Sequence, residues 1–208
     1  MNVFPTLIEA YKLTNIDNDS LVNYAYSLKN KSDGRIASNK GGFHSDDLDY
    51  GRVVSNKGGY QSNDLDFNNI SGLMVEILKH ISAYCGKLNL KKNTTINYTN
   101  AWFNVNGQHD YNMNHTHNGF ISGVYYLQAH TQMGEIVFYN SDKLKDILWH
   151  GEYFENYNEY NNTSFMIKPI TGLLVLFPAW LEHGVEMNGT TDDRISLSFN
   201  TKIEYVAT

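Results

Sequence analysis

The chain has 208 residues, of which 41% are hydrophobic and 18% charged, and its formal net charge at pH 7 is −6. This length and composition predict one globular domain with a substantial core and exclude a disordered chain. The acidic balance argues against a general binder of nucleic-acid backbones, which needs a basic patch to neutralise phosphates.

The cellular compartment is predicted from the cysteine count and from the absence of targeting segments. Cys85 is the single cysteine and cannot form an internal disulfide, which favours a reducing compartment. The N-terminus has no basic segment followed by an apolar one, and no stretch reaches the roughly 18 apolar residues of a membrane span. We therefore expect a cytoplasmic protein with no membrane partner.

Two helices are predicted in the first part of the chain. Residues 19–30 carry apolar side chains on one helical face, and residues 70–88 form a broader apolar stripe at the same spacing. Asn68 or Asn69 is the expected N-cap of the second helix. Cys85 lies on this stripe, where we expect a buried and inert thiol.

A tandem repeat separates the two helices. Residues 34–50 are followed at once by a near copy at 51–67, and both contain Ser-Asn-Lys-Gly-Gly before an aromatic residue. Two copies are too few for a solenoid, so a local duplication is the simpler interpretation. The glycines predict a turn with unusual backbone angles. One copy is expected to be structural and the other a surface insertion, and the sequence does not decide between them.

From residue 94 onward the pattern changes to short strands rich in β-branched and aromatic residues. Many short strands without intervening helices predict a sandwich or barrel, of which the jelly roll is one form. Residues 142–162 form a long aromatic-rich connection, of a length typical of lids and binding loops. The expected strands are 96–105, 120–127, 134–139, 164–168, 172–177, 183–187 and 195–203.

Polar residues set into these strands predict a metal site. His115 and His117 are separated by one residue, so on an extended strand their side chains point the same way; a surface turn is the alternative. His183 comes much later, and Arg194 opens the strand that follows it. Converging imidazoles can hold a divalent metal, and a guanidinium beside them can hold a carboxylate in a two-point fork. The pattern therefore indicates a metal site with an organic acid bound next to it.

The last predicted strand alternates strictly between polar and apolar residues. Such a polar face normally meets solvent, but inside a barrel it lines a cavity, where Arg194 and Ser196 present a charged fork and a hydroxyl to one ligand. The apolar face carries Ile195, Leu197 and Phe199, and the polar face Arg194, Ser196 and Ser198.

These motifs resemble the 2-oxoglutarate- and iron(II)-dependent oxygenase superfamily, and more narrowly a group of small oxygenases of marine bacteria and their phages. The Ser-Asn-x-Gly-Gly element resembles the N-terminal motif of the same group. The matching segments are 102–104, 112–117, 122–127, 134–138, 177–183 and 194–200.

The resemblance implies a mainly β fold with packed helices, namely a double-stranded β-helix (a cupin-like jelly roll). We expect one oxygenase-like domain over residues 1–208, with a helical part at 1–93 and the β-helix core at 94–208. The resemblance also implies a cytoplasmic protein of a bacterium or of a phage-infected host cell.

The resemblance further implies a dioxygenase that uses Fe(II), 2-oxoglutarate and O2, with ascorbate in support, and that hydroxylates a substrate and releases succinate and CO2. Iron would be held by His115 and His183. The residues implied to bind 2-oxoglutarate are Arg194, Ser196, Tyr125 and Asn104, with Tyr126 as the alternative to Tyr125.

The sequence departs from the superfamily pattern at His117, where a carboxylate ligand is usual. His117 is expected to be the third ligand, which leaves the iron more positive by one charge. Otherwise two histidines hold iron with water or another group, and Asp110 and Glu135 are the candidate replacements. Three histidines also resemble the zinc site of hydrating enzymes.

Two further functions stay open at this point. One is a three-histidine zinc or iron enzyme that does not use 2-oxoglutarate, and the other is a non-catalytic jelly-roll module of a phage or bacterial assembly. The substrate of the oxygenase is a peptide, a nucleobase or a small metabolite, and the protein is compatible with a homodimer.

Overall fold

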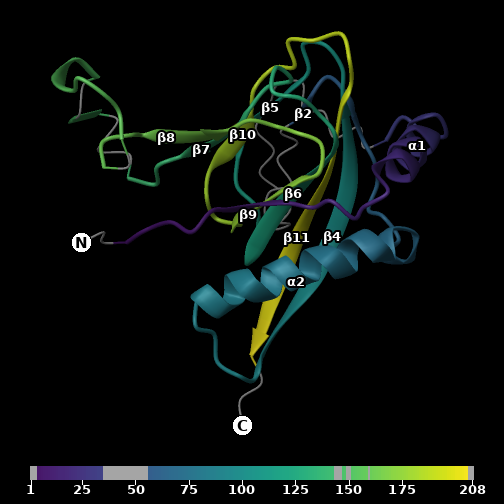
Figure 1. Ribbon diagram of the computed structural model, residues 1–208, viewed down its shortest axis with the longest axis horizontal. Coiled ribbons are helices and arrows are strands. Elements are labelled where there is room, and N and C mark those ends of the chain that lie inside the picture. Colours follow the sequence, from purple (N-terminus) through teal and green to yellow (C-terminus); the bar gives the residue numbers. More distant parts are fainter. Residues whose placement is uncertain (1–3, 35–55, 143–146, 149–150, 159, 206–208) are drawn as a thin grey trace, which may run out of the picture.

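A computed structural model describes residues 4–34, 56–142, 147–148, 151–158 and 160–205, and Figure 1 shows how they are arranged. Two antiparallel sheets face each other and form a double-stranded β-helix, with helices on the outer face of one sheet. The predicted fold class is therefore confirmed. No helix of the described segments is long and apolar enough to span a membrane.

The larger sheet has six strands in the order β1-β9-β6-β11-β4-β3. Its longest pairing is that of the antiparallel strands β11 and β4, which runs from Arg194 opposite Asn106 to Tyr205 opposite Thr94, with one irregularity after Asn200. The strands are β1 (Glu9–Lys12), β3 (Tyr60–Gln61), β4 (Thr94–Asn106), β6 (Ile121–Gln128), β9 (Leu173–Pro178) and β11 (Arg194–Tyr205).

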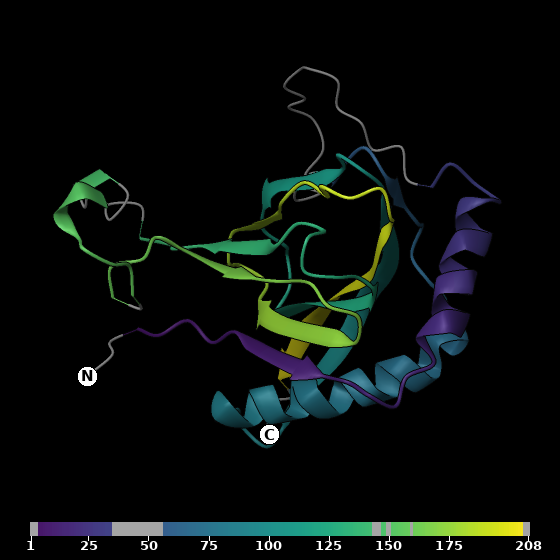
Figure 2. The same ribbon diagram turned by 45° about the horizontal axis from the view of Figure 1, so that its top comes forward.

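The smaller sheet has five strands in the order β2-β5-β10-β7-β8. Its central strand β10 pairs on one side with β5 and on the other with β7. The connection between β7 and β8 extends away from the barrel in both Figure 1 and Figure 2. The strands are β2 (Asn56–Lys57), β5 (Tyr111–His115), β7 (Ile136–Tyr139), β8 (Ser164–Ile167) and β10 (His183–Val185).

Every strand predicted from the sequence is present, and β1, β2, β3 and β5 were missed. Strand β5 has the sequence Tyr-Asn-Met-Asn-His, in which the two apolar side chains, Tyr111 and Met113, are exposed and the neighbouring residues are asparagines. Strands β2 and β3 are two residues each, too short for any periodicity. Only their pairing with other strands defines them.

The helices pack on the outer face of the larger sheet, as Figure 2 shows. Helix α1 (Asn18–Lys29) begins behind Asp17, whose side chain accepts a hydrogen bond from the Ser20 backbone at 3.1 Å. Helix α2 (Ser71–Lys87) presents the predicted apolar stripe to the sheet. A short 3-10 helix, η2 (Gly151–Tyr153), lies in the connection between β7 and β8.

The predicted N-cap of the second helix is wrong. Asn68 and Asn69 lie inside a 3-10 helix, η1 (Phe67–Ile70), which leads directly into α2. The residue that caps this turn is Asp66, which accepts a hydrogen bond from the Asn68 backbone at 2.9 Å. Cys85 is half-buried, and its burial raises the pKa of the thiol, in line with the expected unreactive cysteine.

Apolar side chains form two clusters, one on each side of the larger sheet. The outer cluster lies between this sheet and the helices and includes Tyr125, Leu197 and Phe199. The inner cluster lies between the two sheets and includes Tyr126 and Phe138. Successive residues of one strand therefore belong to different cores, as the alternation of a β-strand requires.

The described part of the second repeat copy, residues 56–67, belongs to the barrel and to the turn that leads into α2. Its residues form β2 and β3, which pair with β5 of one sheet and β4 of the other, and its turn glycines have φ angles of 68° at Gly58 and 66° at Gly59. Tyr60 then enters the outer core. The first copy lies outside the described residues except for Gly34, and so does Trp149 of the predicted binding loop.

Candidate active site

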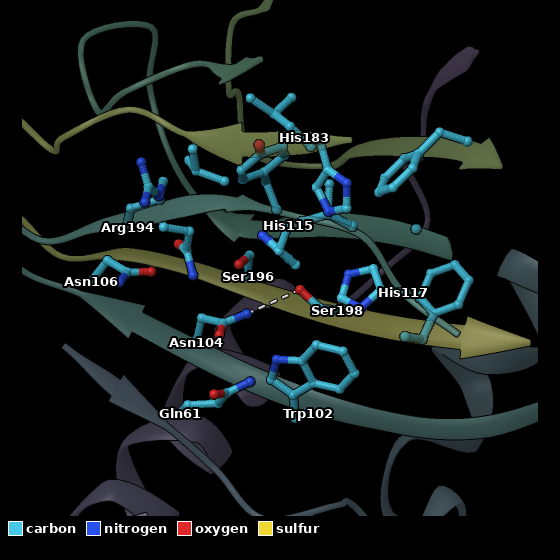
Figure 3. Close-up of a pocket in the computed structure, with 18 residues that line it drawn as sticks. Gln61, Trp102, Asn104, Asn106, His115, His117, His183, Arg194, Ser196 and Ser198 are labelled. Atoms are coloured by element: carbon cyan, nitrogen blue, oxygen red, sulfur yellow. Dashed lines mark hydrogen bonds between the residues drawn. The ribbon is translucent and has the colours of Figure 1, made fainter. Parts of the chain in front are cut away.

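A pocket opens between the two sheets, with an empty volume of about 560 Å³ that includes its solvent-open mouth. Figure 3 shows the histidines of the smaller sheet above it and the polar faces of β4 and β11 below it. The predicted polar face of the last strand does line this cavity: Arg194, Ser196 and Ser198 all point into it.

The three predicted histidines come together at one end of the pocket. His115 ends β5 and His183 begins β10, and the two residues are direct cross-strand partners. His117 lies beyond the end of β5, where its backbone N–H donates to the Ala179 carbonyl at 2.8 Å. The predicted convergence is thus present, although of the closely spaced pair only His115 lies on a strand and His117 follows just beyond its end.

The potential ligand atoms of the three histidines lie within 4.8 Å of one another. Their ring centroids are 4.3 Å apart for His115 and His183, 4.8 Å for His115 and His117, and 5.1 Å for His117 and His183. Among the described residues, this group contains no carboxylate, so neither Asp110 nor Glu135 replaces His117 in it.

Hydrogen bonds to the backbone orient two of the imidazole rings. Nδ1 of His115 lies 2.7 Å from the Met113 carbonyl oxygen, and Nδ1 of His183 lies 2.8 Å from the Leu181 carbonyl oxygen. A carbonyl oxygen only accepts, so each Nδ1 carries the proton and each Nε2 keeps a lone pair. This is the tautomer in which the outer nitrogen anchors the ring and the inner one can bind a metal.

Burial keeps all three imidazoles neutral. Loss of solvation lowers the pKa of His115, brings that of His117 to about 3, and places that of His183 well below its ordinary value. The neighbouring imidazoles add to the effect at His117 and His183, because like charges would repel. The neutral form is the one that binds a divalent cation.

Arg194 lies at the other end of the pocket and is only 2% exposed. Its Nη1 donates to the backbone carbonyls of Met133, Gly134 at 3.3 Å and Glu186 at 3.2 Å. Those are its hydrogen bonds within the described part of the chain, and they leave Nε and Nη2 for a ligand. Gly134 has a φ of 85°, and a Cβ there would crowd both Arg194 Nη1 and the Glu186 carbonyl.

The assignment of Tyr125 to the 2-oxoglutarate site is wrong, because the tyrosine that lines the pocket is its neighbour Tyr126. Tyr125 lies on the helix side of β6 and donates its hydroxyl to Asn18 Oδ1 at 2.9 Å. Adjacent strand residues face opposite sides, so Tyr126 faces the pocket. Its hydroxyl is fully buried without a hydrogen-bond partner among the described residues, and burial raises its pKa to about 12.

The remaining polar residues of the pocket come from the larger sheet. Ser196 is 6% exposed, and Asn104 Nδ2 donates to Ser198 Oγ at 3.0 Å, the contact marked in Figure 3. Trp102 and Asn106 also line the pocket and were missed, although they share the face of Asn104 on β4. Gln61 on β3 was missed too, because a strand of two residues leaves no pattern.

This arrangement supplies what a metal and a dicarboxylic 2-oxo acid would need. Neutral imidazoles can bind a divalent cation, and a buried guanidinium at the far end can fork around a carboxylate. The unpartnered Tyr126 hydroxyl beside Arg194 is a donor that lacks its acceptor. The residues therefore fit both groups.

Comparison with known families identifies the class of enzyme. Residues 100–200 match the family model described as "Putative 2OG-Fe(II) oxygenase". This segment belongs to the 2OG-Fe(II) oxygenase family. The oxygenase is thus an oxidoreductase whose cofactors are Fe(II) and 2-oxoglutarate, as the resemblance implied. No curated protein matches the chain.

Solved structures with the same fold cover almost the whole oxygenase. A prolyl-4-hydroxylase of Pseudomonas putida has a TM-score of 0.60 and 11% identity, over 97% of this chain and 94% of that one. The collagen prolyl hydroxylase of Paramecium bursaria Chlorella virus-1, a 2-oxoglutarate complex, has a TM-score of 0.56 and 14% identity, over 96% of each chain.

A prolyl hydroxylase of Trichoplax adhaerens, in complex with a peptide of hypoxia-inducible factor, has a TM-score of 0.57 and 16% identity, over 93% of this chain and 83% of that one. At these identities the likeness is one of fold. The matched part of the chain includes the N-terminal helices as well as the barrel.

Proposed function

We propose that the oxygenase hydroxylates a carbon–hydrogen bond of its substrate. One atom of O2 would enter the substrate as a hydroxyl group and the other would enter 2-oxoglutarate, which leaves as succinate and CO2. The observation that carries this proposal is the presence of the three-histidine cluster and of the Arg194–Tyr126 pair in one pocket. A site that bound only a metal would not need the Arg194–Tyr126 pair.

His115, His117 and His183 are the proposed iron ligands. The backbone carbonyls behind His115 and His183 hold those two rings with Nε2 toward the cluster. The His117 ring stands edge-on to His115, with an interplanar angle of 88°, and lies 6.0 Å from the Trp102 ring. When bound, iron supplies the oxidation chemistry that no side chain can perform.

Arg194 is the proposed clamp for the distal carboxylate of 2-oxoglutarate. Its Nη1 is held by three carbonyls, so its position is set before any ligand arrives. Tyr126 donates to the same carboxylate and thereby gains the acceptor that its buried hydroxyl lacks. Ser196 adds a third donor, and Asn104, fixed through Ser198, faces the middle of the ligand.

The pocket also keeps water away from the bound 2-oxo acid. Its walls include Val124, Phe177 and Ile136, which are at most 9% exposed. A dry wall strengthens the charged hydrogen bonds of Arg194, since fewer water molecules compete for the carboxylate.

The first test is the turnover of 2-oxoglutarate without a substrate. Protein with Fe(II), ascorbate and 2-oxoglutarate is expected to produce succinate slowly, and Arg194→Ala is expected to raise the 2-oxoglutarate requirement by at least about tenfold, because a charged hydrogen bond is worth about 1.5–3 kcal/mol. Lys202→Ala is the matched control: Lys202 lies on the same strand, is exposed, and pairs with Glu204 at 2.5 Å.

Anaerobic spectroscopy is the second test. Fe(II) protein with 2-oxoglutarate is expected to develop the charge-transfer band of a chelated 2-oxo acid. If there is neither a band nor succinate, the proposal is wrong, and a three-histidine enzyme without 2-oxoglutarate becomes the better account.

The substrate of the proposed hydroxylation is a peptide, a nucleobase or a small metabolite. The Trichoplax structure holds a peptide, which supports peptides as the first class to screen. Exposed aromatic side chains of the β7–β8 connection, Tyr153, Tyr157 and Tyr160, are each at least 60% exposed and offer faces on which a ring or a proline can stack. Substrate-dependent acceleration of succinate release is the readout for such a screen.

A further inference from the structure

Gln61 is a polar side chain of the pocket to which the binding of iron and 2-oxoglutarate assigns no role. It lies on β3, in the second repeat copy, and lines the pocket. Figure 3 shows it at the lower edge of the pocket, on the side away from Arg194 and His183. Its carboxamide offers two N–H donors and a carbonyl acceptor, and it forms no hydrogen bond with another described side chain or backbone group. The amide is therefore available to a ligand.

The second repeat copy holds Gln61 in place from both sides. Tyr60 is buried in the outer core, and Ser62 is buried on the other side of Gln61. The Ser62 backbone N–H donates to the Phe103 carbonyl at 2.9 Å, and Ser62 Oγ accepts from the Phe103 N–H at 3.0 Å. A side chain between two buried anchors is positioned before a ligand arrives, so less conformational entropy is lost on binding.

The strand register separates Gln61 from the clamp for the 2-oxo acid. Four pocket side chains form one row across the larger sheet, each the cross-strand partner of the next: Gln61, Asn104, Ser196 and Tyr126. Neighbouring strands lie about 4.8 Å apart, so the Gln61 backbone is about 14 Å from that of Tyr126. The 2-oxo acid extends from Tyr126 and Arg194 toward the histidines of the facing sheet. The ligand of Gln61 is therefore a second molecule.

The surroundings of Gln61 define the chemistry of that molecule. Trp102 lies on the same face of β4 as Asn104, within diagonal reach of Gln61, and its ring is 6.0 Å from the His117 ring. The described lining contains no acid, and its one fixed cation, Arg194, is occupied by the 2-oxo acid. An uncharged planar group with both an N–H and a C=O suits this corner, because it pairs with the carboxamide and packs on the indole.

We propose that Gln61 is a specificity-determining residue of the hydroxylation: it forms hydrogen bonds with an amide of a peptide substrate, and Trp102 packs against the same group beside the histidines. The second repeat copy thus carries a substrate-recognition residue of the pocket. A nucleobase also presents N–H and C=O groups, but its phosphates need cations, which the described lining and a net charge of −6 do not supply. This inference rests on the proposed function, because it requires turnover of 2-oxoglutarate coupled to a substrate.

The test uses a pooled library of capped, uncharged tripeptides as the probe. Succinate release by the full-length protein is measured with Fe(II), ascorbate and saturating 2-oxoglutarate over a range of peptide concentrations. We expect the library to accelerate succinate release by the wild type. Gln61→Leu keeps the size of the side chain but has neither donor nor acceptor. It should need at least about tenfold more peptide for half of the maximal acceleration, because two hydrogen bonds are lost.

Two variants and one binding measurement make the test specific. Gln61→Glu has nearly the same shape but no N–H, so it should behave like Gln61→Leu, whereas a merely steric role would leave it like the wild type. Gln108→Leu is the matched control, because Gln108 is exposed in the turn between β4 and β5, and it should need the same peptide concentration as the wild type. Calorimetry with Co(II) should give Gln61→Leu the wild-type affinity for 2-oxoglutarate.

Three results would overturn the inference: no acceleration of the wild type by the peptides, equal half-maximal concentrations for the wild type and both Gln61 variants, or a tenfold loss of 2-oxoglutarate affinity in Gln61→Leu. Each of them leaves the proposed function intact as long as the wild type produces succinate. A wild type that produces none contradicts the proposed function itself. Melting curves show whether each variant is folded, and Gln61→Glu decides the matter if Gln61→Leu is not.

Discussion

Removal of the Tyr126 hydroxyl should make the protein more stable and its ligand binding weaker. The hydroxyl is buried without a partner among the described residues, and it lies in the pocket with Arg194. A buried polar group without a hydrogen bond costs about 1–3 kcal/mol of folding free energy. Tyr126→Phe removes that cost and changes the packed volume little.

The expected magnitude can be estimated for both effects. The ligand-free variant should gain about 1 kcal/mol, which corresponds to an increase in Tm of about 2–4 °C for a chain of this size. Loss of a hydrogen bond to a carboxylate costs about 1.5–3 kcal/mol, or about 10–150-fold in the dissociation constant of 2-oxoglutarate. Calorimetric melting of the metal-free protein and titration of 2-oxoglutarate in the presence of Co(II) measure the two quantities.

The neighbouring residue provides the matched control. Tyr125 donates its hydroxyl to Asn18 Oδ1 at 2.9 Å on the opposite face of the same strand. Tyr125→Phe should therefore lower stability by about 0.5–1.5 kcal/mol and leave the affinity for 2-oxoglutarate unchanged. The reasoning is refuted if Tyr126→Phe destabilises the protein and binds 2-oxoglutarate like the wild type.

Three further predictions concern other parts of the structure. Gly134→Ala should weaken 2-oxoglutarate binding at least about tenfold, because a side chain at this position, where φ is 85°, would displace Arg194. An unchanged dissociation constant of 2-oxoglutarate, measured by calorimetry, would contradict this prediction. Deletion of residues 35–51 should change Tm by only a few degrees, because the repeat copy that forms β2 and β3 remains. Gly58→Val should lower the free energy of unfolding by at least about 1 kcal/mol, because Gly58 has a positive φ. Equal melting curves for the two variants would contradict this prediction. The pKa of His117 is about 3 in the folded chain and about 6.5 in an unfolded one. Between these values the unfolded chain binds more protons, so stability should fall as the pH drops below about 6.5. In urea denaturation at pH 8, 6 and 5, His117→Gln should lose less free energy of unfolding on acidification than the wild type. If the two proteins show the same dependence of stability on pH, the histidine is not responsible.

Much of the fold follows from local patterns in the sequence. The apolar stripe from residue 70 to 88 identifies α2 within one or two residues, because helix periodicity depends only on the chain itself. The strict alternation after Arg194 identifies both faces of β11 for the same reason. By contrast, the apolar side chains of β5, Tyr111 and Met113, are exposed among asparagines, so its pairing with neighbouring strands is what defines it as a strand.

The site was predictable in part. The spacing of His115, His183 and Arg194 placed all three in one pocket, and resemblance to a known family gave the same set. The choice between Tyr125 and Tyr126 was not predictable, since both are large, aromatic and on one strand. Gln61 entered the pocket through a repeat whose two copies look alike in sequence.

The sequence by itself determined which side chains share a face, because the side-chain period of a strand is a property of the backbone. It did so for Arg194, Ser196 and Ser198 before any partner strand was known. Only the tertiary structure decided which face is the inside of the barrel, and therefore that Tyr126 and not Tyr125 meets the pocket. It also brought His117 to His183, which are distant in the chain, through the pairing of β5 with β10 and the contact of His117 with Ala179. Such convergence depends on strand pairing between remote segments, which no local pattern encodes.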